Sequence, residues 1–242
     1  MNRQAQEVWH PAMEKGTRFL AYVQLLDSAL PIGSFSHSFG LETYVQEGRI
    51  TTRDQLAAFI ESQLHSNLTR VEGLAIKGCY LALKDGDMDR VAKLDQLVQA
   101  QRLARESREG LQKMGRRLFK LSSTLHPWID FEKLKDALAR HNSSGTLPVI
   151  HAYINYHLEI SLDDAVNGYL YSSVNMMVGS ALRLMSLGQT EGQAILTNML
   201  PVIEREWNAV SHMEPEQMHS FSFSQEIAAM NHETLYSRLF MS

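Results

Sequence analysis

Apolar residues recur at three- and four-residue steps through most of this 242-residue sequence, and this periodicity restricts the fold more than any other feature. The clearest example begins at Thr52, which stands three residues before Gln55 and so has the spacing of a capping box. The pattern predicts one long helix that ends at the turn 84–87. Its apolar face comprises Leu56, Phe59, Ile60, Leu64, Leu68, Val71 and Ala75.

Similar stripes predict further helices along the chain, and together they indicate an all-α fold. Ser161, followed by two aspartates, has the character of an N-cap, and Pro201 is expected to kink or break its helix. Residues 151–160 alternate apolar and polar positions like a strand. Because no second strand signal of similar strength offers it a partner, we predict a helix there as well. The other predicted helices cover 111–125, 131–138, 161–187, 196–210 and 224–238.

The bulk composition is that of an ordinary globular protein, with 44% hydrophobic and 21% charged residues. We therefore predict a single helical-bundle-like domain of roughly eight to ten helices over residues 17–242, preceded by a mobile segment at 1–16. A net charge of −4 argues against a globally basic nucleic-acid binder. The lone Cys79 excludes an internal disulfide and a cysteine-based zinc cluster. The absence of a long apolar run predicts no signal peptide and no membrane span, and hence a cytoplasmic protein.

The segment PIGSFSHSFGLE, residues 31–42, is the most unusual in the chain. Ser36 beside His37 suggests a nucleophile and its base, and a helical hydrolase using this pair is one alternative function. Adjacent residues rarely face each other, and no nucleophile-elbow motif is present, so we do not favour it. A turn at Gly33 with Ser34 or Ser36 capping a helix explains the small residues. It leaves Phe35, His37 and Phe39 unexplained.

Two motifs in the middle of the chain resemble ligand sites. Gly110 and Gly115 have P-loop spacing, but two arginines follow instead of Lys and Ser/Thr, and the segment lies inside a helical stripe, so we reject nucleotide binding. Residues 101–120 contain seven Lys or Arg and two Glu. A solvated helix face is the simplest interpretation, an acidic protein partner is the next, and nucleic-acid binding is a remaining alternative. The histidines form no metal motif, and we predict no metal and no cofactor.

The last segment of the chain is unusually apolar for a terminal region, which is normally polar and frayed. Arg238 stands among these apolar residues, as interface anchors often do. The segment is expected to dock either on the chain's own core or on a partner. Its apolar residues are Ile227, Met230, Leu235, Leu239, Phe240 and Met241.

Four blocks of the sequence together resemble the UreF family of urease accessory proteins. They occur in that family's order and span nearly the whole chain. The first, DSALPIGSFSHSFGLETYV, includes the segment discussed above. The others are RLARESREG at 102–110, LRLMSLGQTEGQ at 182–193 and AAMNHETLYSRLFMS at 228–242.

The resemblance implies an all-helical, non-catalytic protein that forms homodimers and takes part in nickel delivery to apo-urease. Its implied partners are UreD (also called UreH) and the GTPase UreG, with no nucleic acid and no membrane. In the family, the positions matching Phe35 and Arg238 are associated with recruiting the GTPase; some members carry Tyr at the first. The C-terminal segment, here 224–242, is associated with dimerisation and UreD binding. The predicted partner-binding residues are Phe35, His37, Tyr236, Arg238, Leu239 and Phe240.

Overall fold

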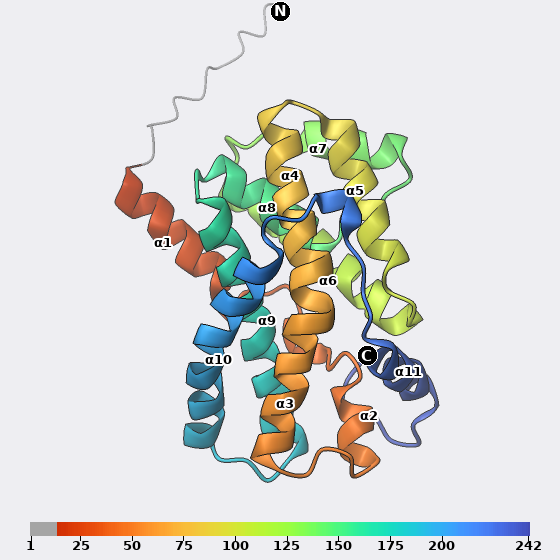
Figure 1. The fold of residues 1–242 in the computed structure, drawn as a ribbon. Coiled ribbons are helices and arrows are strands. Elements are labelled where there is room, and N and C mark those ends of the chain that lie inside the picture. Colours follow the sequence, from red (N-terminus) through yellow and green to blue (C-terminus); the bar gives the residue numbers. More distant parts are fainter. Residues whose placement is uncertain (1–13) are drawn as a thin grey trace, which may run out of the picture.

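The computed structural model describes residues 14–242 as a set of helices packed around one hydrophobic core (Figure 1). No strand occurs in this range, and the predicted all-α fold is confirmed. Short helical turns η1 (Ser34–Ser36), η3 (Pro215–Gln217) and η4 (His232–Thr234) connect the longer elements. The α-helices are α1 (Lys15–Leu26), α2 (Leu41–Gln46), α3 (Arg53–Gln63), α4 (Leu74–Lys84), α5 (Met88–Ala100), α6 (Arg105–Leu125), α7 (Phe131–Arg140), α8 (Leu147–His157), α9 (Leu162–Leu184), α10 (Gln189–Val210) and α11 (Phe223–Asn231).

The long helix predicted after Thr52 is present as a continuous rod of α3, a π-helical segment η2 (Leu64–Gly73) and α4. Its capping box is formed: Thr52 Oγ1 accepts a hydrogen bond from the Gln55 amide at 3.3 Å, and Gln55 Oε1 accepts one from the Thr52 amide at 3.1 Å. The described chain has eleven α-helices. Because α3 and α4 belong to one rod, they form ten separate helices, within the predicted range of roughly eight to ten.

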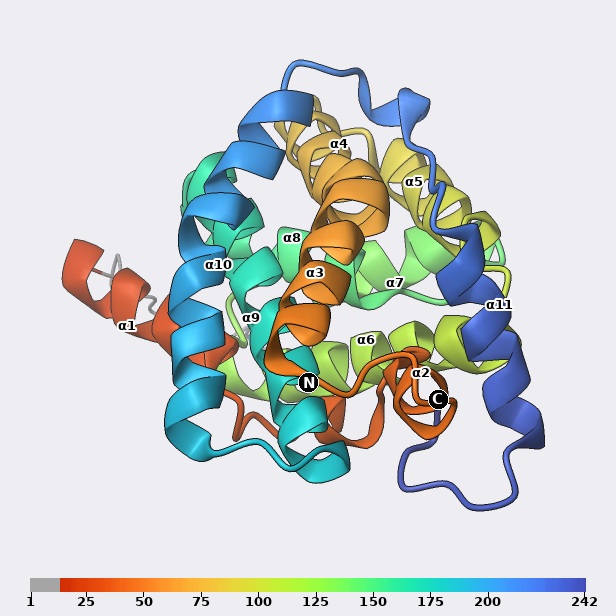
Figure 2. The same ribbon diagram turned by 60° about the horizontal axis from the view of Figure 1, so that its bottom comes forward.

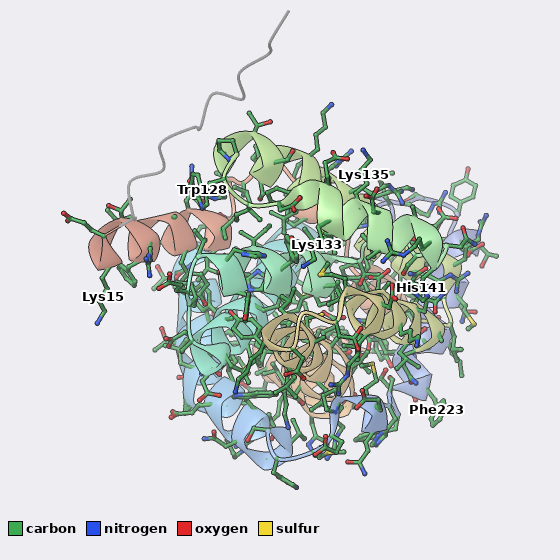
Figure 3. All side chains as sticks on the ribbon, turned by 90° about the horizontal axis from the view of Figure 1, so that it is seen from above. Lys15, Trp128, Lys133, Lys135, His141 and Phe223 are labelled. Carbon is green, nitrogen blue, oxygen red and sulfur yellow. The ribbon has the colours of Figure 1, made fainter. Side chains whose placement is uncertain are left out.

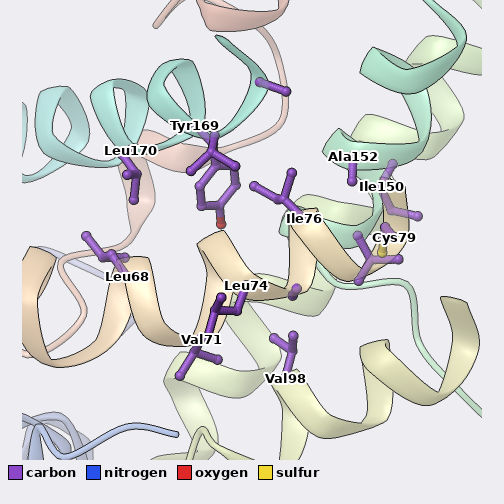
Figure 4. Close-up of a cluster of buried hydrophobic side chains, with 14 of the residues drawn as sticks. Leu68, Val71, Leu74, Ile76, Cys79, Val98, Ile150, Ala152, Tyr169 and Leu170 are labelled. Carbon is purple, nitrogen blue, oxygen red and sulfur yellow. The ribbon is translucent and has the colours of Figure 1, made fainter. Parts of the chain in front are cut away.

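The core surrounds this rod (Figure 4). Side chains from η2 and α4 meet side chains of α5, α8 and α9, and burial of these apolar surfaces is the main stabilising term. The labelled members are Leu68, Val71, Leu74, Ile76 and Cys79 from the rod, with Val98, Ile150, Ala152, Tyr169 and Leu170.

The strand-like segment 151–160 is helical as far as His157, at the end of α8. Every residue from Pro148 to Asn155 is buried, so this helix is covered on all sides. A helix buried all round has no polar face, and its sequence therefore lacks the usual helical alternation. Beyond α8 the chain turns through Glu159, which has a left-handed φ of 56°.

Three predicted boundaries need correction. Of the kink or break expected at Pro201, the break does not occur, because α10 continues through this residue. The buried face around Pro201 packs on α9 and is long enough to hold the helix together. The last helix ends at Asn231 rather than Arg238. Lys15 and Gly16 already belong to α1, and the rest of the predicted mobile segment, residues 1–13, lies outside the described residues.

A buried ionic network joins four elements beside the core. Arg102, 4% exposed, precedes α6 and forms ion pairs with Glu72 of η2 and, at 3.8 Å, with Glu226 of α11. The hydroxyl of Tyr169, on α9, donates to Glu72 at 2.5 Å, and the Ala104 amide donates to Glu226 at 2.8 Å. The guanidinium therefore lies inside the molecule and is no part of the basic face predicted for residues 101–120.

Candidate partner-binding site

The segment 31–42 folds into a turn because several of its residues adopt left-handed backbone angles. Gly33 has a φ of 84°, Gly40 one of 89°, and Phe39 one of 49°. The prediction that Gly33 supplies an unusual backbone is confirmed; a side chain there would also overlap the guanidinium of Arg117. The predicted cap by Ser34 or Ser36 is wrong. The serine that accepts a hydrogen bond from the α2 backbone is Ser38, whose Oγ lies 3.3 Å from the Glu42 amide nitrogen.

The C-terminal tail, residues 235–242, returns to this loop and pairs with it. The Met241 amide donates to the Ser36 carbonyl at 2.8 Å, and the Ser242 carbonyl accepts from the amides of Ser38 (2.6 Å) and Phe39 (3.1 Å). Ser242 Oγ lies 2.7 Å from His37 Nδ1. Figure 2 shows the end of the chain lying beside α2. Two segments about two hundred residues apart in sequence thus form a single site.

Two carboxylates organise the tail. Glu42 of α2, which is buried, accepts from the amides of Leu239 at 2.7 Å and Phe240 at 3.0 Å. Glu106, in the first turn of α6, accepts from the guanidinium of Arg238 at 2.7 Å. The imidazole of His232 lies between the two carboxylates and contacts both. Neither glutamate has a local sequence signal that would mark it out, and sequence reasoning missed both.

The electrostatics of the site follow from this burial. Burial alone would raise the pKa of Glu42, but the hydrogen bonds from the Leu239 amide, from His232 and from the Phe240 amide lower it on balance. Burial lowers the pKa of His37 to about 4, helped by Lys113 and Arg117 on α6. His37 is therefore neutral near pH 7. Its ring fits against α6 because residue 110 is glycine, whose absent side chain leaves the space that the ring occupies.

The structure places the predicted partner-binding residues in two groups. Phe35 is 69% exposed, Tyr236 is fully exposed, and Leu239 is about half exposed. The Arg238 side chain is 40% exposed. In contrast, His37 and Phe240 are only 3% and 4% exposed. His37 is therefore not presented on the surface of this chain, and Phe240 docks on the chain itself, one of the two arrangements expected for the terminal segment.

His37 is buried because it hydrogen-bonds Ser242 beneath the tail, and Phe240 because its ring lies under a guanidinium. That guanidinium belongs to Arg183 of α9, which lies 4.4 Å from the ring centroid and donates to the Phe35 carbonyl at 2.7 Å. Arg183 thus supports both the loop and the tail. It is a further residue that the sequence analysis did not assign to the site.

The same geometry does not pair Ser36 with His37. Ser36 Oγ donates to the Gly33 carbonyl at 2.9 Å, while the nearest partner of the His37 ring is Ser242. The two side chains have separate partners, and His37 Nδ1 is not available to Ser36 as a base. Within residues 14–242 no three His, Cys, Asp or Glu side chains gather as a metal ion would require, and no helix is long and apolar enough to cross a bilayer.

A cavity of about 310 Å³ opens beside the loop, with Ser34 and Phe35 among its lining residues. His151 lines it too; its Nε2 lies 3.0 Å from the Ala165 carbonyl, and burial lowers its pKa to about 4, so the ring is neutral near pH 7. With Nε2 as the donor to that carbonyl, Nδ1 has the free lone pair.

A second exposed apolar surface lies on α11. Phe223, Ile227 and Met230 recur at helical spacing, and all three are exposed. Figure 3 shows Phe223 projecting from the edge of the molecule. Contiguous exposed apolar side chains on a globular protein are typical of partner surfaces. We call these three residues the α11 stripe.

Comparison with known proteins agrees with these observations. The family model named UreF matches residues 50–200. The chain is 37% identical over 225 residues to the urease accessory protein UreF of Bacillus sp. (strain TB-90), an alignment covering 93% of this chain and 99% of the relative. It is 37% identical over 223 residues to the urease accessory protein UreF of Lachnoclostridium phytofermentans, with 92% and 98% covered. The chain therefore belongs to the UreF family of urease accessory proteins.

Proposed function

We propose that this chain is a non-catalytic scaffold in urease maturation. It binds UreD (UreH) and recruits and regulates the GTPase UreG, so that nickel is inserted into apo-urease, and it acts as a cytoplasmic homodimer. The observation that carries the proposal is the union of segment 31–42 with the tail, which brings Phe35 and Arg238 into one site with exposed side chains.

UreG is proposed to dock on the exposed members of this site, which are Phe35, Tyr236, Arg238 and Leu239. Two aromatic side chains, an aliphatic one and an arginine match the composition of interface hot spots. His37 and Phe240 contribute from beneath, by holding the tail against the loop. Phe35 has no hydroxyl, so its contribution is the burial of its ring.

Capture of UreG by the complex of this chain with UreD tests the proposal. We expect Phe35→Ala and Arg238→Ala each to weaken capture by about tenfold or more, as the truncation of a hot-spot residue does. Phe19→Ala is the control for the first, because Phe19 is 59% exposed on α1, away from the site. Arg140→Ala is the control for the second, since Arg140 is an exposed arginine paired with Asp89 at 2.8 Å. Equal capture by all four variants would refute the assignment.

UreD is proposed to dock on the α11 stripe, of which Ile227 and Met230 lie within the segment 224–242 that family resemblance associates with UreD. Ile227 is 57% exposed, and Ile227→Asp would place a charge where an apolar contact is proposed. We expect this variant to lose co-purification with UreD while its circular dichroism spectrum stays that of the wild type. Leu20→Asp, on the exposed face of α1, is the control. Retention of UreD by Ile227→Asp would remove the stripe from the interface.

A further inference from the structure

His232 is a buried histidine with a carboxylate oxygen at each ring nitrogen. Its Nε2 lies 2.9 Å from Glu42 Oε2 and its Nδ1 lies 2.7 Å from Glu106 Oε2, and the side chain is completely buried. A neutral imidazole carries one N–H, so its other nitrogen would present a lone pair to a carboxylate oxygen. Both contacts are attractive only if the ring carries two protons or one carboxyl group carries one.

The neighbouring hydrogen bonds place the protons on the histidine. Glu42 accepts from two backbone amides in addition to His232, and these bonds lower its pKa, which favours the ionised carboxylate. Glu106 accepts from the Arg238 guanidinium through its other oxygen, which also favours the carboxylate. Two ionised carboxylates then face one imidazolium and one guanidinium.

The charged groups around the ring come from every element packed against it. They are Glu42 from α2, Glu106 and Arg105 from α6, and Glu233 and Arg238 from the chain that follows α11. Arg105 pairs with Glu233 at 2.9 Å and so is engaged away from the ring. His37 lies close enough to Glu106 to be influenced by it, but its own low pKa keeps it neutral. Histidine is the side-chain type that changes charge near neutral pH, and at His232 a carboxylate oxygen lies against each ring nitrogen.

We infer that His232 is a positioning residue, held as an imidazolium, which fixes Arg238 through Glu106 and makes partner capture at Arg238 sensitive to pH. The functional half of this inference rests on the proposed role of Arg238 in UreG docking. The structural half concerns this chain alone. The hydrogen-bonded series runs Glu42, His232, Glu106, Arg238, from the buried interior to the exposed guanidinium.

Loss of one ring proton changes both ends of the series. One carboxylate then faces a lone pair, and that carboxylate turns away to water if it is Glu106, whose side chain is 15% exposed. Arg238 loses the fixed acceptor that orients it. Capture of the partner is therefore strongest where the ring carries both protons, and it decreases at higher pH when one of them is lost.

Nuclear magnetic resonance of the free, full-length chain tests the structural half. With 15N-labelled histidine at about pH 6.5, we expect the His232 ring to show a bonded proton on both nitrogens. His151 is the internal control, since it is equally buried but is expected to carry a proton on Nε2 alone. In His232→Gln and in Glu106→Gln, the Arg238 Nε–H signal should move to the averaged position of a solvent-exposed arginine. A His232 ring with one proton, or an Arg238 signal unchanged in both variants, would overturn the inference.

Capture of UreG by the UreD complex, measured from about pH 6 to about pH 9, tests the functional half. We expect His232→Gln to weaken capture roughly tenfold at the lower pH, the equivalent of one charge-assisted hydrogen bond, and to flatten the pH dependence. If Arg238→Ala weakens capture and His232→Gln does not, the inference fails while the proposed function stands. If Arg238→Ala has no effect, the proposed function fails, and the resonance experiment decides the inference alone. Where His232→Gln does not fold, Glu106→Gln takes its place in both experiments.

Discussion

Replacing Arg102 with methionine should destabilise this protein more than replacing any other basic residue between positions 101 and 120. The guanidinium is 4% exposed and is paired with Glu72 and Glu226, which are themselves buried. Methionine has a similar length and no charge, so Arg102→Met leaves two carboxylates in the interior without a cation. Arg102 stands where η2, α9, α11 and the start of α6 meet, so no neighbouring arginine or lysine can substitute.

The magnitude follows from what is left behind. Removing one partner of a buried ion pair costs about 3–5 kcal/mol, because the remaining charge stays desolvated. For a chain of this size each kcal/mol shifts the melting temperature by about 2–4 °C, which gives a decrease of roughly 6–20 °C. The matched variant is Arg105→Met, whose side chain is 62% exposed and pairs with Glu233 at the surface. Its effect should be small, since water solvates the carboxylate that remains.

Urea unfolding followed by circular dichroism at 222 nm, with thermal melts in parallel, measures both variants. A second variant, Arg102→Met with Glu72→Gln, should recover part of the loss because it removes one of the two stranded charges. If Arg102→Met and Arg105→Met have equal midpoints, the guanidinium is solvated and the buried network described above is wrong.

Two further predictions concern helix packing and acid stability. In α9, Gly168→Ala should destabilise the fold by about 1–3 kcal/mol, because a methyl group there overlaps the Tyr22 hydroxyl that anchors α1. Gly179→Ala, in the same helix, has free space and should stabilise the fold by about 0.5–1 kcal/mol. Melting temperatures of the two variants that shift in the same direction would contradict this reasoning. His37 and His151 each have a pKa of about 4, below the ordinary value of 6.5. Between these two pH values the unfolded chain binds protons that the folded chain does not. The free energy of unfolding should therefore decrease by up to about 3 kcal/mol for each histidine as pH falls from about 6.5 to about 4. Urea titrations at several pH values should show that the free energy of unfolding depends less steeply on pH in His151→Gln than in the wild type. An identical pH dependence would show that His151 is not buried as a neutral ring.

Local patterns were sufficient to predict most of the helices, because the apolar face of a helix consists of residues three and four positions apart in the sequence. The rod after Thr52, the cap at Ser161 and the helix ending at Leu125 were all predicted in this way. Local patterns could not predict the π-helical segment inside the rod, because Leu64, Leu68 and Val71 still fall at the three- and four-residue steps of an α-helix. In α8, where burial on all sides removes the polar face, the alternation alone indicated a strand, and the helix was predicted only because no partner strand was available.

The candidate site was predicted only in part, and the reason is sequence separation. Phe35 and Arg238 were singled out by resemblance and by their unusual neighbours, and both have exposed side chains. Glu42 and Glu106 look like ordinary carboxylates in a first helical turn, and Arg102 looks like one more charge in a basic run. Glu42 and Glu106 contact residues more than a hundred positions away in the sequence, and Arg102 contacts Glu72, thirty positions away. A local sequence pattern cannot predict contacts over such separations.

The pairing of segment 31–42 with the tail also determines when this surface can exist. The hydrogen bond between Ser38 and Ser242 closes a loop of 204 residues, so it forms only after the helices between them have brought the two segments together. On the ribosome, Phe35 is made about two hundred residues before Arg238. A chain that is still being synthesised, or whose middle has misfolded, presents one half of the surface without the other. Partners that require both halves would therefore select copies in which folding has brought the two segments together.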